Sequence, residues 1–141
     1  MEQKIFTVHT RGSGFYEFTS GVAEWLHATA PKGQGLLTLF ICHTSASLII
    51  QENADQDVQT DLLEFFNRLV PPSSDQSMSY ITQTHEGPDG MPAHIKAALL
   101  PTHLSIPVID RQMLLGKWQG IYLFEHRTAH CKRQVVGHLS K

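Results

Sequence analysis

The stretch Leu36-Leu37-Thr38-Leu39-Phe40-Ile41-Cys42-His43 is a near-continuous apolar run that ends on a histidine. It is too short for a typical buried helix, and its centre is rich in β-forming residues, so it predicts a central strand. Residues 47–51 predict a second strand soon after it. Side chains alternate between the two faces of a strand, so Leu37, Leu39, Ile41 and His43 share one face. His43 is therefore expected where the core gives way to an opening.

The rest of the chain mixes further strands with a few helices. A short helix is predicted through Val22, Trp25 and Leu26, with Ser20 as its N-cap and the 33–35 segment beyond its end. The 55–69 segment has helical apolar spacing, and the 91–100 segment is opened by Pro92 and stopped by Pro101. Strands are predicted at residues 4–9, 104–108, 113–115, 118–126 and 132–139. Without regular strand–helix alternation, this pattern indicates the α+β fold class.

Composition limits the classes of function. A chain of 141 residues is expected to form one domain, residues 1–141, with a sizeable core. The net charge of −2 argues against nucleic acid as a partner, because phosphate backbones need a basic surface. No apolar stretch approaches about 18 residues, so no membrane insertion is expected. Cys42 and Cys131 have neither disulfide-framework nor zinc-ribbon spacing, which favours a reduced, cytoplasmic setting.

Four of the nine histidines lie in patterned segments: His43, His85, His94 and His126. Imidazole is suited to bind a transition metal or to exchange a proton near neutral pH. His94 is expected in the first turn of its helix, and His126 closes the 118–126 strand. Three imidazoles with an open position would describe a catalytic zinc site, although no HExxH motif is present. The alternative is that each histidine is a hydrogen-bonded rim residue, and spacing alone leaves both interpretations open.

Hydroxyl and basic side chains offer further candidates. Ser47 as a nucleophile beside His43 is disfavoured, because the Gly-x-Ser-x-Gly elbow is absent. Hydroxyls that bind phosphate oxygens or close backbone hydrogen bonds are the preferred interpretation. Phosphate contacts are also open to Arg68, Lys96, Arg127 and Arg133, with exposed salt bridges as the default for each.

Three ordered motifs carry a resemblance to a known family. They are His43-Thr44-Ser45-Ala46-Ser47-Leu48 with Glu52-Asn53-Ala54-Asp55, His85-Glu86-Gly87-Pro88-Asp89 with Met91-Pro92-Ala93-His94-Ile95-Lys96, and the 116–127 segment Gly-Lys-Trp-Gln-Gly-Ile-Tyr-Leu-Phe-Glu-His-Arg. Over nearly the whole chain they resemble the YjbQ family, also called the secondary thiamine-phosphate synthase family. The resemblance implies two packed, mostly antiparallel β-sheets with a few helices, and a homotrimer. It also implies a histidine-lined site suited to a metal ion, and weak thiamine-phosphate synthase activity.

The residues and the resemblance together predict a site for a small phosphorylated molecule, with a divalent metal, zinc or magnesium, as cofactor. The expected alternative is a non-catalytic metal- or anion-binding homotrimer, and a structural protein with incidental histidines is the third possibility. The predicted catalytic residues are His94, His126 and Glu125; the predicted substrate- or phosphate-binding residues are Thr44, Ser45, Arg127, Trp118 and Gln119; the predicted metal ligands are His43, His85 and His94.

The chain departs from the family pattern at three positions. Lys117 stands where the family usually has Thr, Gly90 where it has a second Asp, and Arg111 where it has Gly after Asp. The dedicated enzyme that makes thiamine phosphate is a TIM barrel, for which this chain is too short. With no obvious pair of magnesium-binding aspartates, a low activity is expected.

Overall fold

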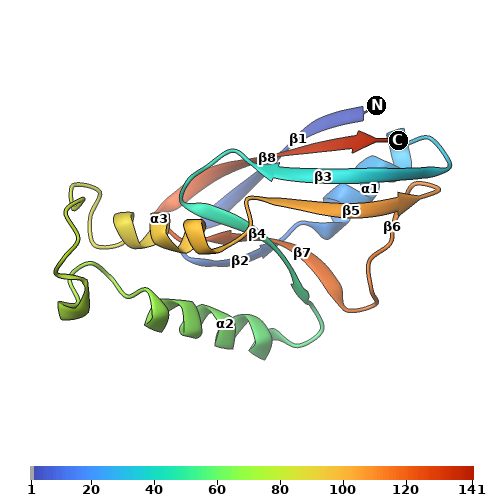
Figure 1. The fold of residues 1–141 in the computed structure, drawn as a ribbon. Helices are drawn as coiled ribbons and strands as arrows, with labels where there is room; N and C mark the ends of the chain where they lie inside the picture. Colours follow the sequence, from blue (N-terminus) through green and yellow to red (C-terminus); the bar gives the residue numbers. More distant parts are fainter. Residues whose placement is uncertain (1) are drawn as a thin grey trace.

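Two antiparallel β-sheets form the framework of the molecule (Figure 1). The structure is a computed structural model that describes residues 2–141. The larger sheet has the order β1-β8-β3-β5-β6, and the smaller has the order β2-β7-β4. Their strands are β1 (Glu2–Arg11), β2 (Gly14–Glu17), β3 (Gln34–Ile41), β4 (Ala46–Glu52), β5 (His103–Ile109), β6 (Gln112–Met113), β7 (Gln119–Glu125) and β8 (His130–Ser140). The predicted α+β class with two sheets is confirmed.

The helices are α1 (Thr19–Thr29), α2 (Gln56–Leu69), the short 3₁₀ turn η1 (Gln76–Met78) and α3 (Gly90–Leu99). The Asp55 side chain caps α2 by accepting the Asp57 N–H at 2.9 Å. In Figure 1, α2 runs along the smaller sheet on the side away from the larger one. Within residues 2–141, every helix is too short or too polar to span a membrane.

The core lies between the two sheets and is closed by α1. The predicted stripe on β3 is confirmed, since Leu37, Leu39 and Ile41 are all buried while His43 beyond the strand is half-buried. From the smaller sheet, Leu48, Ile121 and Leu123 meet this stripe. Both faces of β7 are covered, because Tyr122 and Phe124 on its other face are buried as well. Phe124 packs there against Phe66 of α2, with ring centroids 5.6 Å apart.

Several predicted boundaries need correction. The N-cap of α1 is Phe18 rather than Ser20, because the Phe18 carbonyl accepts the Val22 N–H at 3.3 Å and the helix therefore starts two residues earlier. The predicted 113–115 strand is the short β6, which ends at Met113. Trp118 and His126 flank β7 instead of lying within it. The strand β2 was not predicted at all.

Candidate functional site

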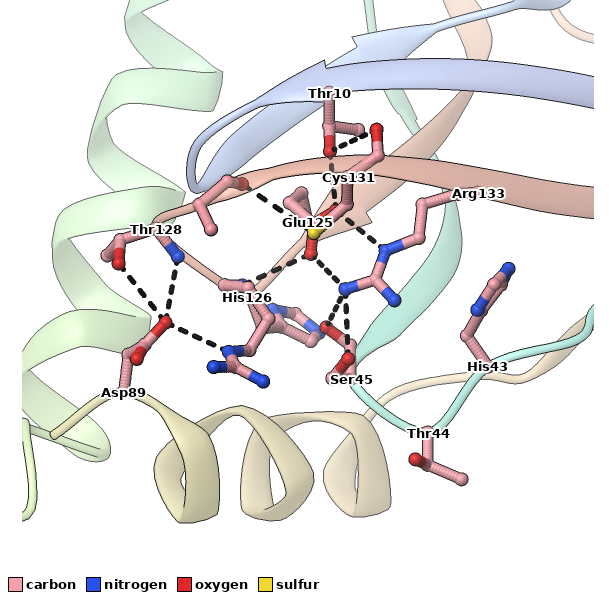
Figure 2. A network of polar contacts seen from close by, with 12 residues as sticks. Thr10, His43, Thr44, Ser45, Asp89, Glu125, His126, Thr128, Cys131 and Arg133 are labelled. Atoms are coloured by element: carbon pink, nitrogen blue, oxygen red, sulfur yellow. Dashed lines mark hydrogen bonds and ion pairs between the residues drawn. The ribbon is translucent and has the colours of Figure 1, made fainter. Parts of the chain in front are cut away.

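The end of β7 is fixed by a buried ion pair between Glu125 and Arg133 (Figure 2). Arg133 Nε donates to Glu125 Oε1 at 2.7 Å, and Arg133 Nη2 donates to Oε2 at 2.5 Å. The Thr10 hydroxyl also donates to Oε1 at 2.6 Å, and the Arg127 N–H donates to Oε2 at 3.1 Å. Each carboxylate oxygen thus accepts two hydrogen bonds, its full capacity. Burial works to raise the pKa of Glu125, but the hydrogen bonds from Arg133 and Thr10 hold it below its usual value.

Two residues predicted at the active site belong to this network. Glu125 is fully enclosed and has no lone pair left for a substrate within one chain. The Ser45 hydroxyl accepts from Arg133 Nη2 at 2.9 Å, and Ser45 is also buried. Within one chain, both side chains therefore position their neighbours rather than face solvent.

His126 follows Glu125 and lies on the opposite side of the chain, as strand alternation requires. Its Nε2 forms a 2.9 Å hydrogen bond with Ser47 Oγ, and its ring packs on Phe124 with centroids 4.4 Å apart. Burial, followed by the nearby Lys96 charge, lowers the pKa of His126 to about 3. His126 is therefore neutral at physiological pH. Ser47 pairs with this histidine and not with His43, the partner weighed from the sequence.

Arg127 joins the end of β7 to the loop before α3. Its Nε donates to Asp89 Oδ2 at 3.0 Å, and its Nη2 donates to the Glu86 carbonyl at 3.1 Å. Thr128 strengthens the same junction, because its N–H donates to Asp89 Oδ2 at 2.9 Å. A phosphate group bound by Arg127, as predicted, would therefore have to compete with the Asp89 carboxylate for the Arg127 guanidinium group.

His94 bridges two segments of the chain. Its Nδ1 lies 2.9 Å from the Thr44 carbonyl, and its Nε2 lies 3.0 Å from Glu86 Oε1. Both partners are hydrogen-bond acceptors, so each ring nitrogen of His94 faces an acceptor. The hydrogen bond from His94, followed by that from Gln83, lowers the pKa of Glu86. His94 is the fifth residue of α3, so its predicted place in the first helical turn was wrong.

His43 and His94 meet at one pocket. We call it the His43 pocket; it measures about 270 Å³ and is lined by His43, Thr44, His94, Ala97, Ala98 and Thr102. The Gln134 N–H donates to His43 Nε2 at 2.8 Å, which puts the proton of the neutral ring on Nδ1. Burial, followed by the Arg133 charge, lowers the pKa of His43.

A second hollow, the Lys96 cavity, lies on the other face of α3. Its volume is about 250 Å³, and it is lined by Ser13, Asn67, Val70, Pro72, Asp89, Pro92, Lys96, His126 and Thr128. Lys96 is buried and donates to Asn67 Oδ1 at 2.8 Å. Sequence reasoning gave Lys96 an exposed salt bridge by default and missed Ser13 and Asn67. Lys96 lies four residues after Pro92 and therefore on the same face of the helix, and this spacing was the available signal for Lys96.

The remaining predicted residues are not brought to either hollow. His85 is exposed, and Trp118 is 53% exposed. Gln119 begins β7, whose ends lie about 20 Å apart at ~3.4 Å per residue, so Trp118 and Gln119 are remote from His126. Within residues 2–141, no three His, Cys, Asp or Glu side chains gather as metal ligands, so the predicted trio His43, His85 and His94 is not assembled by one chain.

The three departures from the family pattern have different surroundings. A Cβ at Gly90 would lie 2.5 Å from Glu86 Cβ, so the Glu86 side chain occupies the space of the expected second aspartate. Lys117 Nζ lies over the exposed Trp118 ring, 4.8 Å from its centroid and away from both hollows. Arg111 has a positive φ of 73°, the backbone conformation for which glycine is favoured.

Comparison with known proteins places the chain among close relatives. The sequence profile of the family described as "UPF0047 protein YjbQ-like" matches residues 4–141. A UPF0047 protein of Synechocystis is 45% identical over 98% of this chain and 90% of its own length. The YjbQ protein of Escherichia coli O157:H7 is 38% identical over 97% of this chain and 96% of its own. A YjbQ/UPF0047 family structure from Clostridium acetobutylicum superposes with a TM-score of 0.83 at 28% identity, covering 96% of this chain and 98% of that one.

Proposed function

The chain belongs to the YjbQ-like UPF0047 family, and from this premise we propose that it binds a small phosphorylated molecule and is a weak thiamine-phosphate synthase. In that reaction, the nitrogen of a thiazole phosphate attacks the methylene carbon of a pyrimidine-methyl diphosphate. The carbon–oxygen bond breaks, and diphosphate leaves with the electron pair. The protein then has to orient two small molecules and stabilise the charge of the leaving group.

The observation that carries this proposal is the convergence of His43, Thr44 and His94 on one pocket. His43 and Thr44 follow β3, whereas His94 lies 50 residues later on α3. The Thr44 hydroxyl and the His43 Nδ1–H supply donors for phosphate oxygens. His94 lies beside them, and its ring is held in place by the Thr44 carbonyl and by Glu86.

The proposed cofactor is a divalent metal, zinc or magnesium. Magnesium is commonly held by one or two carboxylates together with substrate phosphates. Glu86, whose Oε1 lies 3.0 Å from His94 Nε2, is the carboxylate that fits this pattern. Metal analysis of the purified protein, with turnover measured before and after chelation, tests the cofactor separately from the pocket.

The pocket is tested by turnover of pyrimidine-methyl diphosphate and thiazole phosphate by purified variants. We expect Thr44→Val, which removes a hydroxyl at nearly constant volume, and His94→Gln to lower the rate at least tenfold. His9→Gln, at an exposed histidine of β1, is the matched control and should keep the rate of the unmodified protein. Full activity of both pocket variants would show that the reaction does not use this site.

A non-catalytic metal- or anion-binding homotrimer is the second candidate. Its support is an exposed apolar row on the outer face of the larger sheet, where Ile5 and Phe40 both pair in register with Val136. Phosphate binding without turnover would favour this candidate over the enzyme. For either function we propose a cytoplasmic setting, supported by Cys42 and Cys131, which are both free thiols.

A further inference from the structure

The Lys96 cavity is lined by a histidine, His126, that has one ring nitrogen without a hydrogen-bond partner among residues 2–141. His126 is 2% exposed, and its Nδ1 is buried without a hydrogen bond to any of residues 2–141. The Ser13 hydroxyl, which also lines the cavity, is in the same situation. A buried polar group left without a hydrogen bond is destabilising, so both atoms favour a polar occupant.

The Ser47 hydrogen bond decides which nitrogen of His126 carries the proton. Ser47 is fully buried, and His126 Nε2 is its only side-chain hydrogen-bond partner among the described residues. A proton on Nε2 would leave the Ser47 hydroxyl hydrogen buried without an acceptor. Ser47 therefore donates to Nε2, and the neutral ring carries its hydrogen on Nδ1. The unpaired nitrogen of His126 is thus a donor and not an acceptor.

Lys96 adds positive charge to the same space. It is 6% exposed, and only one of the three hydrogens of its ammonium group is used by Asn67 within residues 2–141. Asp89 also lines the cavity, but its carboxylate is already paired with Arg127 and bonded by Thr128.

We infer that the Lys96 cavity binds a small oxyanion, a phosphate or carboxylate group, through Lys96, His126 Nδ1–H and Ser13. All three groups donate, which matches an anion whose oxygens only accept. A volume of about 250 Å³ suits a single phosphate or carboxylate with a small substituent. The site goes beyond the proposed function: Pro92 and Lys96 lie on one face of α3, and the His43 pocket uses His94, Ala97 and Ala98 on the other.

Inorganic phosphate and acetate are the probes for this site. Titration calorimetry gives the affinity, and the ¹⁵N shift of His126 Nδ1 in NMR spectra shows whether the anion reaches this ring. We expect at least one anion to bind and shift Nδ1, with Lys96→Met weakening it at least tenfold. Ser13→Ala, a milder change in a loop, should weaken binding severalfold and is the test if Lys96→Met does not fold.

Two controls separate this site from the His43 pocket. Lys117→Met removes an exposed lysine and should leave the affinity unchanged. In Thr44→Val, which alters the His43 pocket, the anion should still shift the His126 Nδ1 signal. Binding of phosphate only, or of acetate only, identifies the oxyanion class and supports the site. Absence of binding by both probes, or binding that Thr44→Val abolishes and Lys96→Met retains, would overturn it. The second of these outcomes would at the same time support the proposed function.

Discussion

At the scale of single residues, Glu125 accepts four hydrogen bonds inside the protein. The loss of its charge should therefore lower the free energy of unfolding by an amount that can be estimated. Glu125→Gln keeps the shape but leaves the buried Arg133 guanidinium without a counter-charge. Breaking one side of a buried ion pair costs about 3–5 kcal/mol. We therefore expect urea unfolding at neutral pH to show that Glu125→Gln lowers the free energy of unfolding by this amount.

The matched control is Glu64→Gln at the exposed pair with Arg68, whose Nε lies 2.8 Å from Glu64 Oε1. Exposed pairs of this kind contribute about 0.3–0.5 kcal/mol. Equal losses for the two variants would contradict the structural role of Glu125. A loss of activity in Glu125→Gln without a loss of stability would instead support its predicted catalytic role.

His126 predicts a specific dependence of stability on pH. Its pKa is about 3 in the folded protein and near 6.5 when unfolded, so the unfolded chain binds a proton first as the pH falls. The contribution of neutral His126 to the free energy of unfolding is fully present above pH 6.5, and it is lost as the pH falls from 6.5 to about 3. We expect a contribution of a few kcal/mol to disappear over this window, measured by unfolding at a series of pH values.

Because Glu86, Asp89 and Glu125 also titrate in acid, the informative quantity is the difference between the unmodified protein and His126→Gln. Because the pKa values of these carboxyl groups are lowered in the folded protein, their protonation reduces the free energy of unfolding only at the acid end, in and below the usual carboxyl range. Protonation of His126 in the unfolded chain reduces it already from pH 6.5 downward. If the two proteins lose stability in parallel between pH 6.5 and 5, the burial of a neutral His126 is not the cause.

At the scale of secondary-structure elements, the turn between β5 and β6 is a two-residue hairpin loop. Asp110 and Arg111 both have positive φ, 46° and 73°, and the flanking Ile109 and Gln112 are paired. Such a turn favours Asn, Asp or Gly, and a residue with a side chain in this region costs about 1–2 kcal/mol. Arg111 offsets part of this cost, because its Nε donates to the Ala30 carbonyl at 2.8 Å.

A pair of substitutions isolates the backbone strain at Arg111. Both Arg111→Gly and Arg111→Ala lose the bond to Ala30, but only glycine relieves the positive φ. We expect the glycine variant to be more stable than the alanine variant by about 1 kcal/mol, measured by thermal or urea unfolding. Equal stability would mean that the turn relaxes to another conformation when the arginine is removed.

Sequence patterns predicted the elements in which buried residues recur at the regular spacing of a strand or a helix. The apolar run of β3 and the helical spacing of α2 both depend on neighbours within one element, and both were placed within two residues. In contrast, β2 has four residues and is defined by its pairing with β7, more than 100 residues later. Local patterns carry no information on such a pairing. Strand alternation puts Arg133 on the same buried face of β8 as Val135, but an exposed salt bridge was predicted for it because charged side chains are mostly exposed.

The same reasoning explains how much of the candidate site was predictable. The apolar stripe of β3 indicated that His43 lies where the core opens, and the structure places it half-buried beside the His43 pocket. His126, which follows β7, is buried instead. What lies opposite these residues depends on tertiary packing, so the Ser47–His126 bond and the buried Lys96 were not foreseen. The family motifs also grouped His85 and Trp118 with the site, but within one chain both side chains are exposed and lie away from it.

At the scale of the whole molecule, the predicted homotrimer needs an apolar surface that one chain leaves uncovered. The outer face of the larger sheet offers Ile5, 57% exposed, and Phe40, 50% exposed, on either side of Val136. Subunit interfaces are depleted of charge at their centre, so a carboxylate at this position would oppose association. We expect light scattering to give the unmodified protein three times the 15.8 kDa mass of one chain, and Phe40→Glu to lower that mass.

The control for this prediction is Phe65→Glu, at another exposed phenylalanine on α2, outside the larger sheet. It should keep the assembly of the unmodified protein, since it adds the same charge at a distance from the proposed interface. Loss of assembly in Phe40→Glu alone would place the interface on the sheet. If both variants dissociate, or neither does, the sheet face is not the surface that joins the subunits. Circular dichroism must show unchanged secondary structure, because Phe40 is half exposed and its substitution disturbs the core little.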